Sequence, residues 1–239
     1  MSSTAAILVI GNEILSGKVE ETNARFLTRE LRDLGVQLRR VVTVADEIDA
    51  IAEEASPLSQ RFNHVFTSGG VGPTHDDVTM LGLAKGLGRP MVRHPLLERL
   101  IRSHFQDPGL ERNLRMADVP EGTECLPVSG TEWPVLRLNN IYILPGVPQL
   151  FARKFSSIRE RFRAPPFFLR TLLLEAEEGT IAELLEQTQT RWPAVDVGSY
   201  PQFGDGPPKV KITLEGKDQA AVEAATTHLL ARLEKGALL

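Results

Sequence analysis

The sequence has little cysteine and few aromatic residues, and it lacks both long apolar runs and a basic excess. Its one cysteine, Cys125, excludes an intramolecular disulfide and a zinc site built from several cysteines. Basic residues number 27 against 31 acidic ones, whereas a general nucleic-acid binder shows a basic excess or stripe. The apolar run at residues 5–10 is too short for a membrane span or a signal peptide. We therefore expect a cytoplasmic protein that binds neither nucleic acid nor membrane.

What is present is the composition of an ordinary globular protein. The chain has 239 residues, of which 42% are hydrophobic and 24% charged. This length allows a medium domain followed by a small one. The Ala-Pro-Pro segment at residues 164–166 reads as a linker. We expect one domain over residues 1–163 and a second over 167–239.

Strand and helix patterns alternate in the first of these domains. An apolar run predicts a strand at 5–10, residues 36–44 and 64–68 are interpreted as two further strands, and 3.6-residue periodicity predicts helices at 22–34, 46–55 and 78–87. This alternation is typical of an α/β fold with a mostly parallel sheet. A helix at 95–105, an irregular stretch at 107–133, a hairpin around Asn139 and Asn140, and a helix from Pro148 follow.

The pattern changes after the linker. Residues 167–176, 195–200 and 210–214 predict strands, and residues 218–234 predict a helix. Thr180 and Glu183 form a capping-box pattern that predicts the start of another helix. The order strand, helix, strand, strand, helix predicts a small α+β domain, ferredoxin-like or KH-like in outline.

The segment 67–79 (TSGGVGPTHDDVT) joins a predicted strand to a predicted helix and combines glycines with two aspartates. Gly69, Gly70 and Gly72 allow positive φ angles, so the backbone N–H groups can form a nest for an anion. Asp76 and Asp77 have two interpretations. They could cap the helix, or they could hold a magnesium-type ion that bridges carboxylate and phosphate.

Other polar residues follow neighbouring predicted strands, and the carboxyl ends of parallel strands share one edge of the sheet. Asp46 is either a helix N-cap or a member of this site. Glu13 has no capping role, because the predicted helix begins later. Asn23 is either an N-cap or a ligand contact. His75 is interpreted as a solvated loop side chain.

The chain resembles the MoaB/Mog superfamily of molybdenum-cofactor biosynthesis. It is most similar to the N-terminal region of CinA-type competence/damage-inducible proteins and to the molybdopterin-binding-like domain of FAD synthases. The matching motifs are 11–17 (GNEILSG), 22–27 (TNARFL), 34–35 (LG), 45–47 (ADE), 68–79 (SGGVGPTHDDVT), 113–117 (NxxMA), 119–122 (VPEG) and 144–148 (LPGVP). The segment 130–134 (GTEWP) departs from the CinA pattern, which puts the far wall of the pocket and the substrate in question.

The resemblance implies a three-layer α/β/α domain and assigns roles to individual residues. Those matched to phosphate or substrate binding are Gly69, Gly70, Gly72, Pro73, Thr74, Asn23, Pro145 and Gly146. Asp46, Asp77 and Glu13 match catalytic or polar site positions, and Asp76 is the extra acid of the CinA-like branch. Asp76 and Asp77 would hold Mg²⁺ or a similar divalent ion, with K⁺ as a further candidate.

The function expected from this resemblance is divalent-metal-dependent hydrolysis of nucleotide pyrophosphates such as ADP-ribose or FAD. The alternatives are molybdopterin binding or adenylylation, and a non-catalytic nucleotide- or pterin-binding module. The expected partner is a small phosphorylated nucleotide or pterin, and relatives that form dimers or trimers suggest a homo-oligomer. No deamidase or FAD-forming adenylyltransferase domain is recognised, so neither activity is expected.

Overall fold

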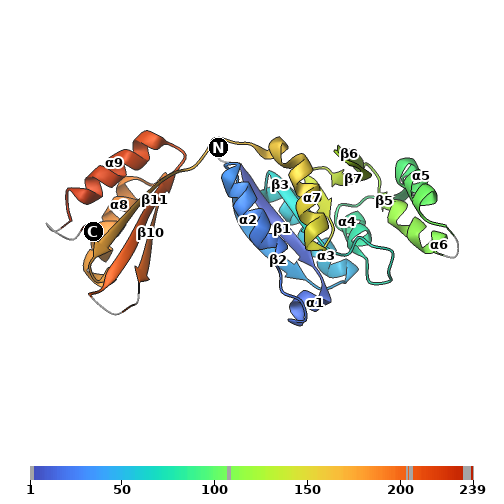
Figure 1. Cartoon of the computed structure of the whole chain (residues 1–239), viewed down its shortest axis with the longest axis horizontal. Coiled ribbons are helices and arrows are strands. Elements are labelled where there is room, and N and C mark those ends of the chain that lie inside the picture. The colour runs from blue at the N-terminus through green and yellow to red at the C-terminus, as the bar shows by residue number, and fades with distance from the viewer. Residues whose placement is uncertain (1–2, 107–108, 203, 205–206, 234–237, 239) are drawn as a thin grey trace. The chain divides into compact units, whose positions relative to one another are not determined.

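The computed structural model describes residues 3–106, 109–202, 204, 207–233 and 238. The chain divides into two compact units, Met1–Ala164 and Pro165–Leu239, which we describe separately. In the colours of Figure 1, unit 1 runs from blue to yellow and unit 2 is orange to red. No helix in the described part of the chain has the length and apolar character needed to cross a membrane.

Unit 1 alternates strands and helices along most of its length. Its strands are β1 (Thr4–Ile10), β2 (Gln37–Val44), β3 (His64–Ser68), β4 (Met91–Arg93), β5 (Asp118–Pro120), β6 (Glu124–Val128), β7 (Thr131–Leu138) and β8 (Ile141–Leu144). Its helices are α1 (Asn12–Leu15), α2 (Asn23–Asp33), α3 (Ile48–Arg61), α4 (Thr79–Gly86), α5 (Pro95–His104), α6 (Leu110–Asn113) and α7 (Pro148–Ile158), with the 3₁₀ turns η1 (Leu114–Ala117) and η2 (Arg159–Phe162).

The main sheet of unit 1 has the strand order β2-β1-β3-β8-β7-β6. Strands β2, β1, β3 and β8 are parallel, and the β6–β7–β8 meander adds two antiparallel strands at one side. Asn139 turns the chain between β7 and β8 with a φ of 55°, the left-handed conformation that this two-residue turn requires. The mostly parallel sheet expected from the sequence is confirmed.

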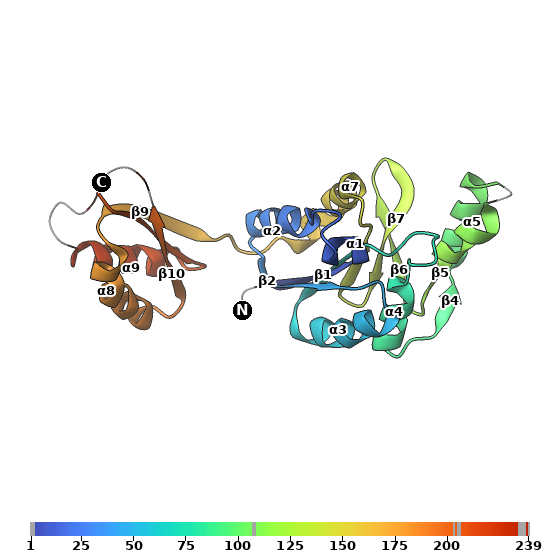
Figure 2. The same cartoon turned by 90° about the horizontal axis from the view of Figure 1, so that it is seen from below.

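Helices cover both faces of this sheet (Figure 2). Side chains alternate along β1, so that Ile7 and Val9 pack under α2 and α7 while Leu8 and Ile10 pack against α3 and α4. Burial on both faces explains why β1 is a continuous apolar run, because neither set of side chains meets water. The arrangement is the three-layer α/β/α domain.

The expectation that residues 107–133 are irregular is wrong for most of this stretch. It contains α6, η1, β5, β6 and the first residues of β7, whereas residues 107–108 lie outside the described chain. Strand β5 pairs with β4 and strand β6 with β7, so these short elements depend on partners distant in sequence. Three to five residues carry too little periodicity to be recognised alone.

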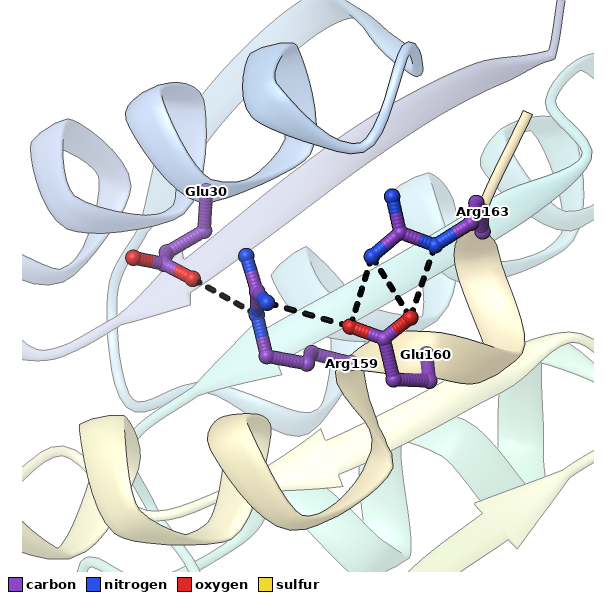
Figure 3. Close-up of polar contacts among 4 residues, drawn as sticks. All are labelled: Glu30, Arg159, Glu160 and Arg163. Carbon is purple, nitrogen blue, oxygen red and sulfur yellow. Dashed lines mark hydrogen bonds and ion pairs between the residues drawn. The ribbon is translucent and has the colours of Figure 1, made fainter. Parts of the chain in front are cut away.

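A chain of ion pairs ties the last turn of unit 1 to helix α2 (Figure 3). Arg159 Nε donates to Glu30 Oε2 at 3.0 Å, and Arg159 Nη1 donates to Glu160 Oε1 at 3.1 Å. Arg163 adds a two-pronged contact to Glu160, with distances of 2.7 and 2.8 Å. The N–H of Ala164 then donates to Leu34 O at 2.8 Å. The C-terminal segment of unit 1, from Arg159 to Ala164, is therefore bonded to helix α2 and its C-cap residue.

Unit 2 is a small α+β unit, as expected. It contains β9 (Phe168–Glu175), α8 (Glu178–Arg191), β10 (Val195–Gln202), β11 (Lys209–Gly216) and α9 (Gln219–Leu230). Strand β11 lies between β10 and β9 and is antiparallel to both, so β9 and β10 are parallel across it. Its core forms where α8 and α9 pack against one face of this sheet.

Two helix ends in unit 2 differ from expectation. The capping box at Thr180 is wrong, because α8 begins at Glu178 and the Thr180 hydroxyl donates to Glu177 O at 2.7 Å inside the first turn. Helix α9 begins where expected, and the Asp218 carboxylate accepts from the N–H groups of Ala220 and Ala221. Within the described residues α9 ends at Leu230 rather than at 234.

Candidate functional site

The loops that follow β1, β2, β3 and β8 meet at the carboxyl edge of the main sheet. Directly after β1, Gly11 N–H donates to Val44 O at the end of β2, at 3.1 Å. Directly after β3, Gly69 N–H donates to Leu144 O at the end of β8, at 3.3 Å. An edge of this kind is where open parallel sheets bind ligands, because helix starts and strand ends converge there.

The glycine turn after β3 requires glycine for steric as well as conformational reasons. Gly69 has a φ of +107° and Gly70 a φ of +63°, which side chains rarely tolerate. A Cβ at Gly69 would lie 2.2 Å from Ile10 O, and one at Gly70 would lie 2.4 Å from Thr79 Oγ1. Gly72 does not use a positive φ, but a Cβ there would lie 2.7 Å from the Asp77 carboxylate.

Helix α4 begins against this turn and holds it in place. The buried Thr79 hydroxyl donates to Gly69 O at 2.9 Å, and Thr79 N–H donates to Gly70 O at 3.1 Å. Sequence reasoning did not single out Thr79, although a hydroxyl residue that ends the glycine–aspartate segment was the available signal. It is a positioning residue for the turn.

Asn23 joins the loop after β8 to the end of β3. Its side-chain amide nitrogen donates to Ser68 Oγ and to Gly146 O, both at 2.8 Å, and the residue is only 6% exposed. The N-cap interpretation of Asn23 is wrong, because Thr22 occupies that position. A Cβ on Gly146 would lie 3.3 Å from the Gly69 Cα, so the Pro145–Gly146 loop borders the glycine turn.

The paired aspartates do not cap helix α4, whose N-cap is Val78 without a side-chain bond. Instead they surround Thr74. Thr74 N–H donates to Asp77 Oδ2 at 2.8 Å, and the Thr74 hydroxyl lies 2.6 Å from Asp76 Oδ1 and 2.5 Å from Asp77 Oδ2. The Thr74 hydroxyl lowers the pKa of Asp76, with further contributions from the residue's own N–H and from His75. Thr74 therefore positions both carboxylates.

Asp46 and Glu13 enter the same edge from the loops after β2 and β1. The N-cap interpretation of Asp46 is wrong, since Glu47 occupies that position in α3 and Asp46 Oδ2 accepts from Asn12 N–H at 2.7 Å. The expectation that no helix begins near Glu13 is also wrong, because Glu13 lies in the first turn of α1. Its carboxylate folds back to within 2.9 Å of the position of a Cβ on Gly11.

Three neighbouring acids act electrostatically on Asp46. Burial raises the pKa of Asp46, and repulsion from Glu13, Asp76 and Asp77 raises it further, against the Asn12 N–H, which lowers it. Negative charge from three separate loops therefore accumulates beside the glycine turn.

The described residues contain no group of three or more histidine, cysteine or acidic side chains placed to hold a metal ion. A fully protein-made metal cage is thus absent from the described part of the chain. An ion that keeps several waters and needs only one or two carboxylates fits Asp76 and Asp77. The His75 side chain is 95% exposed and lies 3.9 Å from Asp76, as expected of a solvated loop residue.

Residues 6–163 match the family model described as a probable molybdopterin binding domain. The chain belongs to this family. Residues 166–239 match a second model, described as the middle domain of FAD synthase. The two matches together account for both units of the structure.

Individual relatives span the FAD synthase and CinA branches. The chain is 32% identical to a probable FAD synthase of Caenorhabditis elegans over 95% of its own length, but it spans only 49% of that protein. It is 31% identical to a CinA-like protein of Frankia casuarinae, over 98% of this chain and 59% of that one. A CinA structure from Thermoplasma acidophilum matches 67% of this chain and 98% of that one, with 28% identity and a TM-score of 0.60.

Proposed function

We propose that the chain hydrolyses nucleotide pyrophosphates of the ADP-ribose or FAD type with the help of a divalent metal ion. The observation that carries the proposal is Asp46, whose pKa is raised by burial and by three further acids beside a glycine turn. A carboxylate whose pKa is raised by burial and by neighbouring acids at the carboxyl edge of a parallel sheet favours a catalytic site over a structural one.

The charge of the site supports a cation. Four carboxylates next to a turn suited to phosphate would repel a phosphorylated ligand unless a positive ion accompanied it. Asp76 and Asp77 would hold Mg²⁺ or a similar ion, and Thr74 presets both carboxylates. When bound, such an ion supplies charge neutralisation and polarisation of a phosphoryl oxygen.

The chain's own residues would perform the remaining work. The glycine turn admits the pyrophosphate close to the backbone, because no Cβ intervenes at Gly69 or Gly70. Asp46 accepts a proton from the attacking water, and Glu13 raises its basicity by repulsion. The new P–O bond forms as the P–O bond of the anhydride breaks, and the leaving phosphate takes the electron pair. ADP-ribose would yield AMP and ribose 5-phosphate, and FAD would yield AMP and FMN.

A second candidate is transfer of an adenylyl group to a phosphorylated acceptor such as molybdopterin. The family description and the FAD synthase names of relatives favour it. The same glycine turn and acids would serve, with the acceptor phosphate in place of water. A third candidate is a binding module without turnover.

The test incubates the purified chain with ADP-ribose or FAD, with and without Mg²⁺, Mn²⁺, Co²⁺ or added K⁺, and measures AMP by chromatography. We expect metal-dependent AMP release. Asp46→Asn and Asp77→Asn should lower kcat by roughly 10²–10⁴-fold, and Asp49→Asn, an exposed carboxylate on α3, is the matched control. Absence of AMP from both substrates with every metal rules hydrolysis out. AMP transfer that requires molybdopterin and ATP would instead establish the second candidate.

The pH dependence of the reaction provides an independent readout. Glu13 raises the pKa of Asp46, so Glu13→Gln should lower that pKa. The base must be deprotonated to act, and the acidic limb of kcat/KM should therefore move to lower pH in this variant. An unchanged acidic limb in a variant that still turns over would exclude Asp46 as the base.

A further inference from the structure

Two edge strands of the described sheets, β10 and β6, are obstructed. Strand β10 is an edge strand of unit 2, and the Gln189 side chain closes part of it. Gln189 Nε2 donates to Val195 O at 2.9 Å, and Val197 N–H donates to Gln189 Oε1 at 3.0 Å. One amide thus takes the place of a residue in a parallel neighbouring strand. Pro201 removes a further N–H from the same side of β10, two positions beyond Ser199.

The β6 edge of the main sheet is interrupted as well. Its register shifts between Leu126 and Val128, and Pro127 lies at that point. Irregularity and proline both prevent another strand from pairing along an edge. The edge strands β10 and β6 are therefore protected by different means.

Strand β2, at the opposite edge of the main sheet, is open in its second half. Among the described strands it pairs with β1 alone, and Val41 is 52% exposed. The Gly11 N–H reaches Val44 O, so Val42 and Val44 direct their backbone groups toward β1, and Val41 and Thr43 direct theirs outward. The register of the β1–β2 pair shifts earlier in β2, at Arg39, so the second half of the strand is regular. The sequence VVTV from Val41 is strongly β-forming and contains no proline.

A groove of about 1100 Å³ lies beside this edge. Its lining includes Arg39, Arg40 and Arg61, and no acidic side chain is among the described residues that line it. Arg61 also stacks over the Phe62 ring, at 5.7 Å from the centroid, and Arg40 is 3.8 Å from Glu54. In a chain with a net charge of −4 this is a local concentration of positive charge.

The positive charge beside the β2 edge indicates which kind of chain can bind there. Two copies that paired β2 with β2 would bring their arginines together, and such repulsion disfavours self-association through this edge. The same arginines attract an acidic segment. We propose that the β2 edge binds an extended acidic segment of a partner protein by strand addition, with backbone bonds to Val41 and Thr43 and charge pairing to Arg39 and Arg61.

Labelled peptides test both parts of this proposal on the full chain. A short peptide that alternates Val and Glu should bind, as measured by fluorescence anisotropy, and the same peptide with Lys for Glu should bind at least tenfold more weakly. Two further versions carry N-methyl groups on alternate residues, in one phase or the other. Only the phase that faces β2 should abolish binding, because successive N–H groups of a strand point to opposite sides. Equal binding of both methylated peptides would overturn strand addition and leave simple attraction of anions.

Variants of the protein separate charge from backbone. Arg39→Glu and Arg61→Glu should each weaken binding of the Val–Glu peptide about tenfold, whereas Arg99→Glu on α5 makes the same charge change elsewhere and should have no effect. Val41→Pro removes an outward N–H and should abolish binding, with circular dichroism to verify folding. Unchanged binding in both arginine variants contradicts the proposal. Self-association sensitive to Val41→Pro, seen by sedimentation without peptide, would contradict it in favour of a second copy.

Discussion

The sheets of the two units differ in what covers them. The main sheet of unit 1 has helices on both faces, whereas the sheet of unit 2 packs against helices on one face only. Along β11, buried Val210, Ile212 and Leu214 alternate with partly exposed Lys211 and Thr213. Two-sided burial makes the central strand β1 apolar from Ala5 to Ile10, and the polar side chains of the site lie in the loops beyond the strand ends. The site therefore forms in unit 1, where loops after four strands converge.

The largest expected effects come from core substitutions in one unit, with the unfolding transitions of both units measured. Phe155 is fully buried in unit 1 and lies against the rings of Phe26, Phe66 and Phe162. Phe155→Ala should cost about 3–5 kcal/mol, and Ile212→Ala in unit 2 about 2–5 kcal/mol. Each unit has one tryptophan, Trp133 or Trp192, so single-tryptophan backgrounds report each unfolding transition in urea. If Phe155→Ala moved both transitions equally, the two cores would not be independent.

A smaller pair of effects compares one amide side chain in each unit. Asn23→Ala leaves the buried Ser68 hydroxyl and Gly146 carbonyl without their donor and should cost unit 1 about 1–3 kcal/mol. Gln189→Ala frees two backbone groups at a strand edge that water can reach, and should cost unit 2 about 0.5–1.5 kcal/mol. The same urea titrations measure both. If Gln189→Ala lowered the free energy of unfolding more than Asn23→Ala, the β10 backbone groups that Gln189 binds would be less accessible to water than their position at a strand edge indicates.

The smallest effect is the pH dependence that a partly buried histidine gives to unit 1. Burial beside Tyr142 and Phe162 lowers the pKa of His64 below its ordinary value of 6.5. The unfolded chain then binds the proton more readily, so the stability is full above pH 6.5 and falls as the pH drops toward the lowered pKa. His64→Phe should flatten this part of the stability curve relative to the parent, with His75→Gln as the control. An identical slope in parent and His64→Phe would exclude the histidine as its source.

The elements that could be predicted are those whose own residues carry the signal. Strand β1 is apolar from Ala5 to Ile10 because both of its faces are buried, and the convergence of Glu13, Asp46 and the aspartate pair follows from parallel strand ends sharing an edge. Elements that depend on distant partners, such as β5 and β6, could not be found in the same way.

The sequence indicates which residues lie in the site better than it indicates their hydrogen-bond partners. From the sequence, helix capping accounts for Asp46, Asp76 and Asn23 as well as a site role does, since all three are good N-cap residues. The fold decides otherwise, because Asn12 N–H, the Thr74 hydroxyl and Gly146 O are nearer partners than the helix ends. Helix α1 was missed because four residues show no period and no side chain caps its first turn from the N-cap position.

The ion-pair chain at the end of unit 1 also has a mechanical consequence. A pull on the linker first loads Ala164, which is bonded to Leu34, and then the contacts of Arg163 and Arg159 with Glu160 and Glu30. The force therefore passes sideways into α2 before it can unwind the turn that follows α7. Because Arg159 directly follows α7, the same contacts hold the end of a helix whose first residue, Pro148, follows the Pro145–Gly146 loop of the site.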